Sequence, residues 1–231
     1  MHQLRLNDAA ISLHRVLSAH GVKFGIFGGY AVAALGGPRE SKDVDCLACV
    51  NKDQILNILD GKSGFVAVPQ SRRDYVAFLW SDKPNRERAV LIEIFCEGFP
   101  GATFNMSNVV PNVTQIAGET QGSGATSFLD PVYLFKGKLR AAATRSKFHD
   151  SADLRWLETY ALSTLQANKS QFSSLYVGLA LKRYPELHHC FERIGLDIDA
   201  ATNAAAAYDL HHLPPPQPGD VQNGLLATGN T

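Results

Sequence analysis

The feature that most constrains the fold is a short apolar run that ends in two consecutive glycines and leads into an alanine-rich segment. The run, Val22 to Phe27, has the length and composition of a buried strand, and Tyr30 to Leu35 is helix-prone. Gly28 and Gly29 lie between them, where the lack of Cβ atoms lets the backbone turn sharply and present N–H groups to an anion. A glycine pair at a strand end is also often only a tight turn, so this motif alone leaves both interpretations open.

Two aspartates at alternate positions begin the next β-rich run. If Asp43 to Val50 is a strand, its period of two puts the carboxylates of Asp43 and Asp45 on one face of the sheet. Two like charges held this close are costly unless a cation lies between them, and oxygen ligands of this kind suit Mg²⁺. The other interpretation is a solvated strand entrance, which Asp-x-Asp often is.

A single acid lies in the middle of a later apolar run. Glu93 stands inside Leu91 to Phe95, a predicted strand, and burying its charge there without a partner is expensive. The side chain either faces water on an edge strand or meets Asp43 and Asp45 across neighbouring strands. The order of these features along the chain is far more specific for one kind of site than any single feature. That order is a strand, a glycine pair, a helix, an acid pair and a later lone acid.

The remaining patterns divide the chain into an α/β part and a helical part. Residues 97–127 are rich in Gly, Asn, Thr and Ser and contain one short candidate strand, Val113 to Ile116, whereas Asp130-Pro131 is a good helix opening. Further strands are predicted at Phe65 to Val68, Tyr75 to Trp80 and Ala89 to Phe95, and helices at Asn7 to His20, Tyr133 to Thr144, Asp153 to Leu162 and Phe172 to Leu181. We therefore expect an α/β domain over residues 1–127, a helical part packed on it over 128–199, and a flexible tail over 200–231.

Composition excludes several classes of protein. The chain has 231 residues, 45% of them hydrophobic, and 22 basic residues balance 22 acidic ones. This balance argues against a protein that coats nucleic acid or an anionic membrane through its overall charge. The first residues lack a secretory signal, no stretch is apolar enough to span a bilayer, and four cysteines are too few for a disulfide scaffold. We expect a cytoplasmic protein with reduced thiols and no membrane partner.

The stretch from Gly28 to Val50, GGYAVAALGGPRESKDVDCLACV, resembles the signature of the nucleotidyltransferase superfamily, which has the DNA polymerase beta-like fold. The closest similarity is to the minimal and abortive-infection toxin-type members, in which an Arg-x-Ser/Thr-x-Asp-x-Asp segment follows the glycine pair and an Ala-rich helix. The segments Phe135 to Arg140 and Arg145 to Leu154 resemble the helices of the toxin-type branch. The resemblance implies an α+β fold, a mixed β-sheet flanked by helices and followed by a helical part.

The resemblance also implies roles for the glycine pair and the three acids. Gly28 and Gly29 are expected to hold the triphosphate of an NTP, and Asp43 and Asp45 to hold Mg²⁺ or Mn²⁺ against it. Glu93 is expected to complete the second metal site and to act as, or to orient, the general base. The chemistry implied is phosphoryl transfer assisted by two metal ions.

Two flanking basic residues and one further acid belong to the same set of candidates. Arg39 and Lys42 flank the acid pair and are expected to neutralise phosphate oxygens, or else only to offset the neighbouring acids. The third acid is often Asp in members of the superfamily, so Glu97 competes with Glu93 for that role.

Five basic residues and no acid lie between Lys136 and Lys147. With the signature upstream, Lys138 is expected to bind the triphosphate, although a charge run of this kind is usually a solvated helix face. Asp150 and Asp153 are close enough in sequence to pair with these bases, a structural role that we favour for them over a catalytic one.

The predicted function is Mg²⁺-dependent transfer of a nucleoside monophosphate from an NTP to a hydroxyl or phosphate acceptor, with release of pyrophosphate. The alternative is a catalytically inactive nucleotide-binding or antitoxin-like protein-interaction module of the same fold. Retention of all three candidate acids and the glycine pair favours the enzyme. The partners are an NTP and an acceptor that is a small molecule, a protein or a tRNA end, and the sequence does not choose among these or give the oligomeric state.

Overall fold

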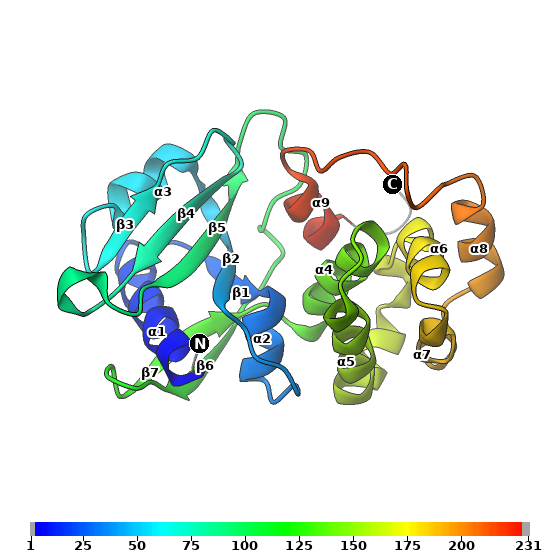
Figure 1. Cartoon of the computed structure of the whole chain (residues 1–231), viewed down its shortest axis with the longest axis horizontal. Helices are drawn as coiled ribbons and strands as arrows, with labels where there is room; N and C mark the ends of the chain where they lie inside the picture. Colours follow the sequence, from blue (N-terminus) through cyan, green and yellow to red (C-terminus); the bar gives the residue numbers. More distant parts are fainter. Residues whose placement is uncertain (1–2, 228–231) are drawn as a thin grey trace. The chain divides into compact units, whose positions relative to one another are not determined.

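The computed structural model describes residues 3–227, which form two compact units (Figure 1). Unit 1 contains the described residues up to Asp130 together with Val221–Asn223. Unit 2 contains Pro131–Asp220 and the described residues from Gly224 onward.

Unit 1 is built around one mixed sheet. Its elements in chain order are α1 (Gln3–Ala19), β1 (Phe24–Phe27), α2 (Gly28–Ala34), β2 (Asp43–Asn51), α3 (Lys52–Leu59), β3 (Phe65–Val68), β4 (Tyr75–Trp80), the 3-10 turn η1 (Pro84–Arg86), β5 (Val90–Gly98), β6 (Asn112–Ala117) and β7 (Ser123–Phe128). The strand order is β3-β4-β5-β2-β1-β7-β6, with β2–β5 and β1–β7 parallel and the other neighbours antiparallel. The α+β class expected from the sequence is confirmed.

Helices α1 and α3 contact the sheet and each other, and burial alternates along the first residues of β2 and of β5. On β5, Val90, Ile92 and Ile94 are fully buried, whereas Leu91 and Glu93 between them are only partly buried. Burial of the apolar side chains supplies most of the favourable free energy of folding. Because successive side chains of a strand point to opposite faces, Leu91 and Glu93 lie on the face of the sheet opposite to Val90, Ile92 and Ile94.

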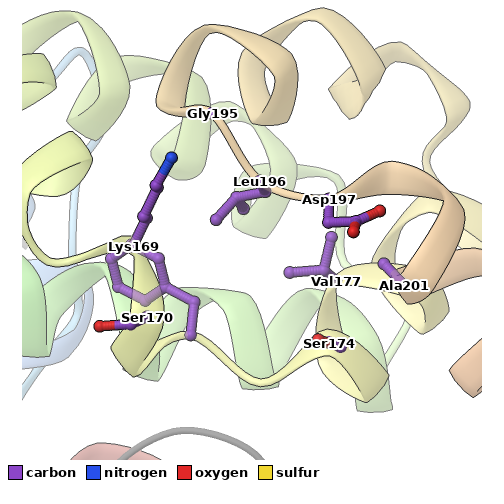
Figure 2. A pocket seen from close by; sticks show the side chains of 9 residues that line it. Lys169, Ser170, Ser174, Val177, Gly195, Leu196, Asp197 and Ala201 are labelled. Carbon is purple, nitrogen blue, oxygen red and sulfur yellow. The ribbon is translucent and has the colours of Figure 1, made fainter.

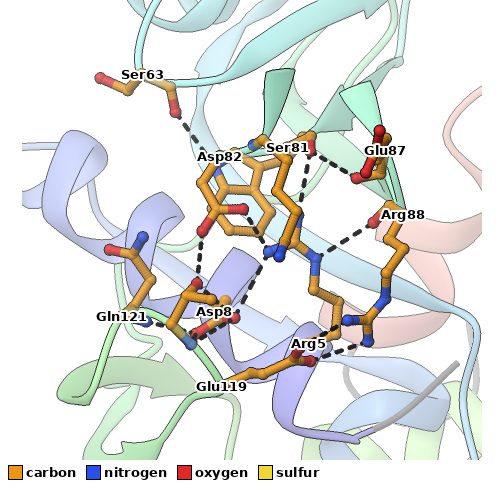
Figure 3. A network of polar contacts seen from close by, with 12 residues as sticks. Arg5, Asp8, Ser63, Ser81, Asp82, Glu87, Arg88, Glu119 and Gln121 are labelled. Atoms are coloured by element: carbon orange, nitrogen blue, oxygen red, sulfur yellow. Dashed lines mark hydrogen bonds and ion pairs between the residues drawn. The ribbon is translucent and has the colours of Figure 1, made fainter. Parts of the chain in front are cut away.

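Two buried charged residues of α1, Arg5 and Asp8, join this helix to two loops of unit 1 (Figure 3). Arg5 is fully buried, and its guanidinium lies 4.6 Å from the centre of the Trp80 ring. Its Nη1 and Nη2 donate to Asp82 Oδ1 at 2.6 Å and to Ser81 Oγ at 3.1 Å, in the loop after β4. Asp8, one helical turn further along α1, accepts from the backbone N–H of Thr120 and Gln121 in the β6–β7 turn. The buried charge of Arg5 is tolerated because acids and hydrogen-bond acceptors surround its guanidinium.

Unit 2 is helical. Its elements are α4 (Pro131–Thr144), α5 (Phe148–Ala167), the 3-10 turn η2 (Lys169–Gln171), α6 (Ser174–Arg183), the 3-10 turn η3 (Pro185–Leu187), α7 (His188–Ile194), α8 (Ile198–Ala205) and α9 (Asp220–Leu226), of which residues 221–223 belong to unit 1. Phe135 is fully buried and contacts the rings of Phe172 at 4.8 Å and Phe191 at 6.4 Å between centroids. Among residues 3–227, no helix combines the length and the apolar character that a membrane crossing requires.

The sequence missed one strand and several helices. Residues 97–127 were expected to contain a single strand, but β7 (Ser123–Phe128) follows β6 and pairs with both β6 and β1. The segment 200–231, expected to be a flexible tail, contains the end of α8 and all of α9. Its flexibility stays a prediction, and residues 228–231 lie outside the described residues.

Candidate active site

The three predicted acids come from two neighbouring parallel strands. In the register of β2 and β5, Asp45 faces Glu93 and Asp43 faces Leu91. Residues that face each other on paired strands project from the same side of the sheet, so Asp43, Asp45 and Glu93 share one face. Val44, between the two aspartates, is fully buried on the other side.

The first glycine of the pair lies directly against this acid cluster. Gly28 follows β1, whose last residue Phe27 faces Asp45 across the sheet. A Cβ atom on Gly28 would lie 2.1 Å from Asp45 Oδ2, and the φ angle of Gly28 is +75°. Only glycine adopts this conformation without strain and also leaves room for the carboxylate.

The second glycine lies against a basic and a hydroxyl side chain. A Cβ atom on Gly29 would lie 2.7 Å from Arg39 Nη2 and 3.1 Å from Ser41 Oγ. The buried Ser41 hydroxyl lies 3.1 Å from Asp43 Oδ1, to which it donates. The structure thus brings Arg39 to the glycine pair, and it places the side chain of Lys42 in solvent.

Glu93, and not Glu97, is adjacent to the aspartates. Glu97 lies four residues further along β5, about 13 Å from Glu93 along the strand. Its Oε2 accepts a hydrogen bond from the backbone N–H of Met106 at 2.8 Å. Burial and the Asp43 charge raise the pKa of Glu93 above its ordinary value, and the Arg72 charge opposes them in part. A raised pKa is the expected result of burying a carboxylate and placing a second one on the same face.

Two residues near Glu93 were not singled out from the sequence. Arg72 Nε donates to Asp74 Oδ1 at 2.9 Å, and Asp74 is fully buried. The Arg72 guanidinium also lies 4.9 Å from the centre of the Tyr75 ring. The Asp74 carbonyl oxygen accepts from Gln222 Nε2 at 2.7 Å, which anchors this corner of the sheet. An Arg-x-Asp spacing before a predicted strand was the available signal, and it has many structural explanations.

Lys138 lies in unit 2, where it is buried in a cluster of opposite charge. Its Nζ atom lies 2.6 Å from Asp153 Oδ2 and 3.7 Å from Asp150 Oδ1, and all three residues are at most 5% exposed. Arg145 Nε also donates to Asp150, at 2.7 Å. The structural pairing considered from the sequence is present, so a phosphate-binding role for Lys138 would require this buried pair to open.

The Asp150→Asn variant is expected to lower the free energy of unfolding by about 2 kcal/mol at pH 7, because it leaves two cations short of one partner. Burial raises the pKa of Asp150, but the Arg145 hydrogen bonds and the Arg145 and Lys138 charges outweigh it and hold the pKa below its ordinary 3.8. The stabilisation is therefore complete above pH 3.8 and is lost as the pH falls through the lower folded-state value. Urea unfolding at pH 7 and pH 3 measures both effects.

Asp199→Asn is the matched control. Asp199 is an exposed acid of the same unit, and its substitution should change the free energy of unfolding by less than about 0.5 kcal/mol. Equal losses in the two variants would contradict the prediction.

Comparison with known proteins places this fold. No protein-family model matches the sequence, and no curated protein is significantly similar to it. Among solved structures, an antigenic nucleotidyltransferase-like protein from Paracoccidioides brasiliensis superposes with a TM-score of 0.54 at 16% identity, over 82% of this chain and 93% of that one. The chain has a nucleotidyltransferase-like fold. The resemblance inferred from the sequence is thereby confirmed at the level of the fold.

Two further nucleotidyltransferase structures show weaker similarity. The MenT4 nucleotidyltransferase toxin from Mycobacterium tuberculosis H37Rv has a TM-score of 0.48 at 14% identity, over 95% of this chain and 91% of that one. The lincosamide antibiotic adenylyltransferase LnuA, solved with lincomycin bound, has a TM-score of 0.41 at 10% identity, over 63% and 91%. Neither value supports a statement about the reaction of this chain.

The acid face of this nucleotidyltransferase-like fold fits a divalent cation that is shared with a substrate. As the side chains stand, residues 3–227 contain no group of three or more His, Cys, Asp or Glu close enough to hold a metal ion by themselves. Mg²⁺ in proteins is commonly bound by one or two carboxylates together with substrate phosphates, which does not require such a group. Asp43 and Asp45 would supply the carboxylates, and the missing Cβ of Gly28 leaves space beside Asp45 Oδ2.

A separate cavity of about 420 Å³ lies in unit 2 of the nucleotidyltransferase-like fold (Figure 2). Its lining includes Lys169, Val177, Leu196 and Asp197 and none of the predicted site residues. The Asp197 side chain accepts from the backbone N–H of Ala200 as the N-cap of α8, so this carboxylate already has a structural role.

Proposed function

We propose that this chain is a nucleotidyltransferase that moves a nucleoside monophosphate from an NTP to a hydroxyl or phosphate acceptor and releases pyrophosphate, in a Mg²⁺-dependent reaction. The observation that carries the proposal is the contact between Gly28 and the Asp45 carboxylate, on the face shared with Asp43 and Glu93. A glycine at a positive φ angle, packed on one of three acids that share a face, has a clear use where a triphosphate and its cation must approach the backbone.

The residues of the chain divide the work of the proposed reaction. Asp43 and Asp45 offer carboxylate oxygens to Mg²⁺, and the Ser41 hydroxyl holds Asp43 in place. When bound, Mg²⁺ supplies charge neutralisation for the phosphates and lowers the pKa of the acceptor hydroxyl. Gly29 and Arg39, which lie together, bind triphosphate oxygens through the backbone N–H and the guanidinium.

In the chemical step, the acceptor oxygen forms a bond to the α-phosphorus as the bond from that phosphorus to the bridging oxygen breaks. The leaving group is pyrophosphate, and the Glu93 carboxylate accepts the proton of an acceptor hydroxyl. A raised pKa suits this residue to hold a proton, because a general base works best when its pKa lies near the operating pH.

Incubation with each radiolabelled NTP, Mg²⁺ and a cell extract tests the proposal. Labelling of one size class of molecule supports it and identifies the acceptor as a small molecule, a protein or an RNA. Thermal unfolding with Mg²⁺ and each NTP reports binding separately, since a ligand of the folded state raises the Tm by mass action. Binding without any labelling would favour the inactive nucleotide-binding module.

The Glu93→Gln variant is expected to lose turnover and yet to gain about 0.5–1 kcal/mol of unfolding free energy at pH 7 in EDTA. The folded-state pKa of Glu93 is raised, so its ionisation destabilises the fold as the pH rises from 4.5 through the folded value. The gain should therefore vanish at pH 4, where wild-type Glu93 is protonated. Urea unfolding at the two pH values measures it.

Glu97→Gln is the matched control for Glu93→Gln, on the same strand. A glutamine at position 97 retains an oxygen to accept the Met106 N–H, so both stability and turnover should stay close to wild type. Loss of turnover in Glu97→Gln with normal turnover in Glu93→Gln would reverse the assignment of the third acid.

A further inference from the structure

The two edge strands of the unit 1 sheet, β3 and β6, differ in whether their outward backbone groups have hydrogen-bond partners. At one edge, the outward backbone groups of β3 are occupied: Ala67 N–H donates to Asp60 Oδ1 at 2.8 Å, and Phe65 C=O accepts from Gly61 N–H at 3.0 Å. Proteins commonly cover or interrupt such edges, because unpaired backbone groups are a template for another strand.

At the other edge, β6 has outward groups without such partners. The bond from Gly118 N–H to Gly122 C=O closes the β6–β7 turn at 2.9 Å and fixes the alternation of the ladder. The backbone groups of Val113, Gln115 and Ala117 therefore point away from β7. Ala117 C=O accepts from Asn7 Nδ2 at 2.6 Å. Within residues 3–227, no other hydrogen bond reaches these outward groups.

The sequence of β6 does not protect this edge. The strand reads Asn-Val-Thr-Gln-Ile-Ala, with no charge, no proline and an unbroken register with β7. Its side chains are almost all exposed, including Val113 at 65%. Lysine, proline or a bulge would normally occur in a strand that must stay unpaired.

We propose that β6 is a strand-addition surface for a second copy of this chain, with β6 pairing antiparallel to its copy about a two-fold axis at Thr114. In this register Val113 faces Gln115 of the second copy, and Gln115 faces Val113. Each of these residues has one N–H and one C=O directed outward, so every one of these groups finds a partner in the copy. The uncharged strand brings no like charges together. A six-residue strand pair is a small interface, so the dimer is reversible and concentration-dependent.

Disulfide trapping tests both the surface and the register. In a Cys49→Ser background, which removes the exposed native thiol, Thr114→Cys places two thiols across the two-fold axis. The Cα atoms of such a non-hydrogen-bonded pair are about 4.5 Å apart, within the range of a disulfide. Asn112→Cys, on the same face of the strand, is the matched control, because its copies would be about 13 Å apart. Rapid covalent dimer formation by Thr114→Cys alone is expected. Equal or absent cross-linking in the two variants would overturn the proposal.

Light scattering with a proline variant gives an independent result. Gln115→Pro removes an outward N–H and leaves the ladder to β7 intact, since proline is accepted at such edge positions. The wild-type mass should rise with concentration from 25.1 kDa toward twice that value, and the variant should stay at 25.1 kDa with an unchanged Tm. A wild-type mass of one chain at all concentrations, or a dimer that survives Gln115→Pro, would overturn it. The proposal would also be overturned if β6 bound an extended peptide from another protein in place of a second copy.

Discussion

Asp45→Asn is expected to reduce Mg²⁺-dependent pyrophosphate release by at least about a thousandfold, with the Tm within about 2 °C of wild type. The amide keeps the shape of the side chain against Gly28 but removes the charge that a cation and a triphosphate require. Asp43→Asn should behave in the same way, because Asp43 shares the acid face. Transfer from a labelled NTP and release of pyrophosphate measure the loss, and thermal unfolding monitors the fold.

Asp53→Asn is the matched control for the two aspartate variants. Asp53 is exposed in the first turn of α3 and has no place in the proposed site. Its substitution should leave turnover within a factor of two of wild type. Undiminished release in both Asp43→Asn and Asp45→Asn would rule out the assignment of the metal site.

Gly28→Ala is expected to cost 1–2 kcal/mol of stability and roughly a hundredfold in turnover. The φ angle of +75° is unfavourable for alanine, and the new methyl group would meet Asp45 Oδ2 at 2.1 Å. The carboxylate must move to relieve this contact, which displaces a proposed cation ligand. Denaturant unfolding and initial rates at saturating NTP measure the two losses separately.

Gly21→Ala separates backbone strain from the steric effect. Gly21 has a similar φ of +65°, but a Cβ atom there meets nothing within 4 Å. It should lose a similar amount of stability and keep its turnover. If Gly21→Ala and Gly28→Ala had equal turnover, the contact between Gly28 and Asp45 would have no role in function.

Much of unit 1 was predictable because local patterns dominate there. The acid-bearing strand was expected from Asp43 to Val50 and runs from Asp43 to Asn51, whose side chain caps the following helix α3. The strand Ser123–Phe128 was not predicted, because Ser-Gly-Ala-Thr-Ser has the composition of a loop. Its strand conformation depends on distant partners: it pairs with β1 and β6, and the Thr126 hydroxyl donates to the Ala10 C=O of α1.

For the candidate site, too, the features set by local spacing could be predicted and those set by contacts between distant segments could not. Spacing alone placed Asp43 and Asp45 on one face, but the parallel pairing that brings Glu93 beside Asp45, and not Glu97, could not be derived from spacing. Lys138 was harder to interpret, because its buried partners Asp150 and Asp153 lie on the next helix. The sequence favoured pairing of these acids with the basic run, but only the packing of the two helices shows that the pairing buries Lys138.

The anchoring of Gln222 has a consequence for how the polypeptide matures on the ribosome. Its side chain is 1% exposed within unit 1 and donates to the carbonyl oxygens of Asp74 and Cys96. All of Pro131–Asp220 must be translated before this glutamine emerges. The nascent sheet therefore lacks these two hydrogen bonds until translation has passed the helical segment, and a stop codon before position 222 would leave that corner permanently without them.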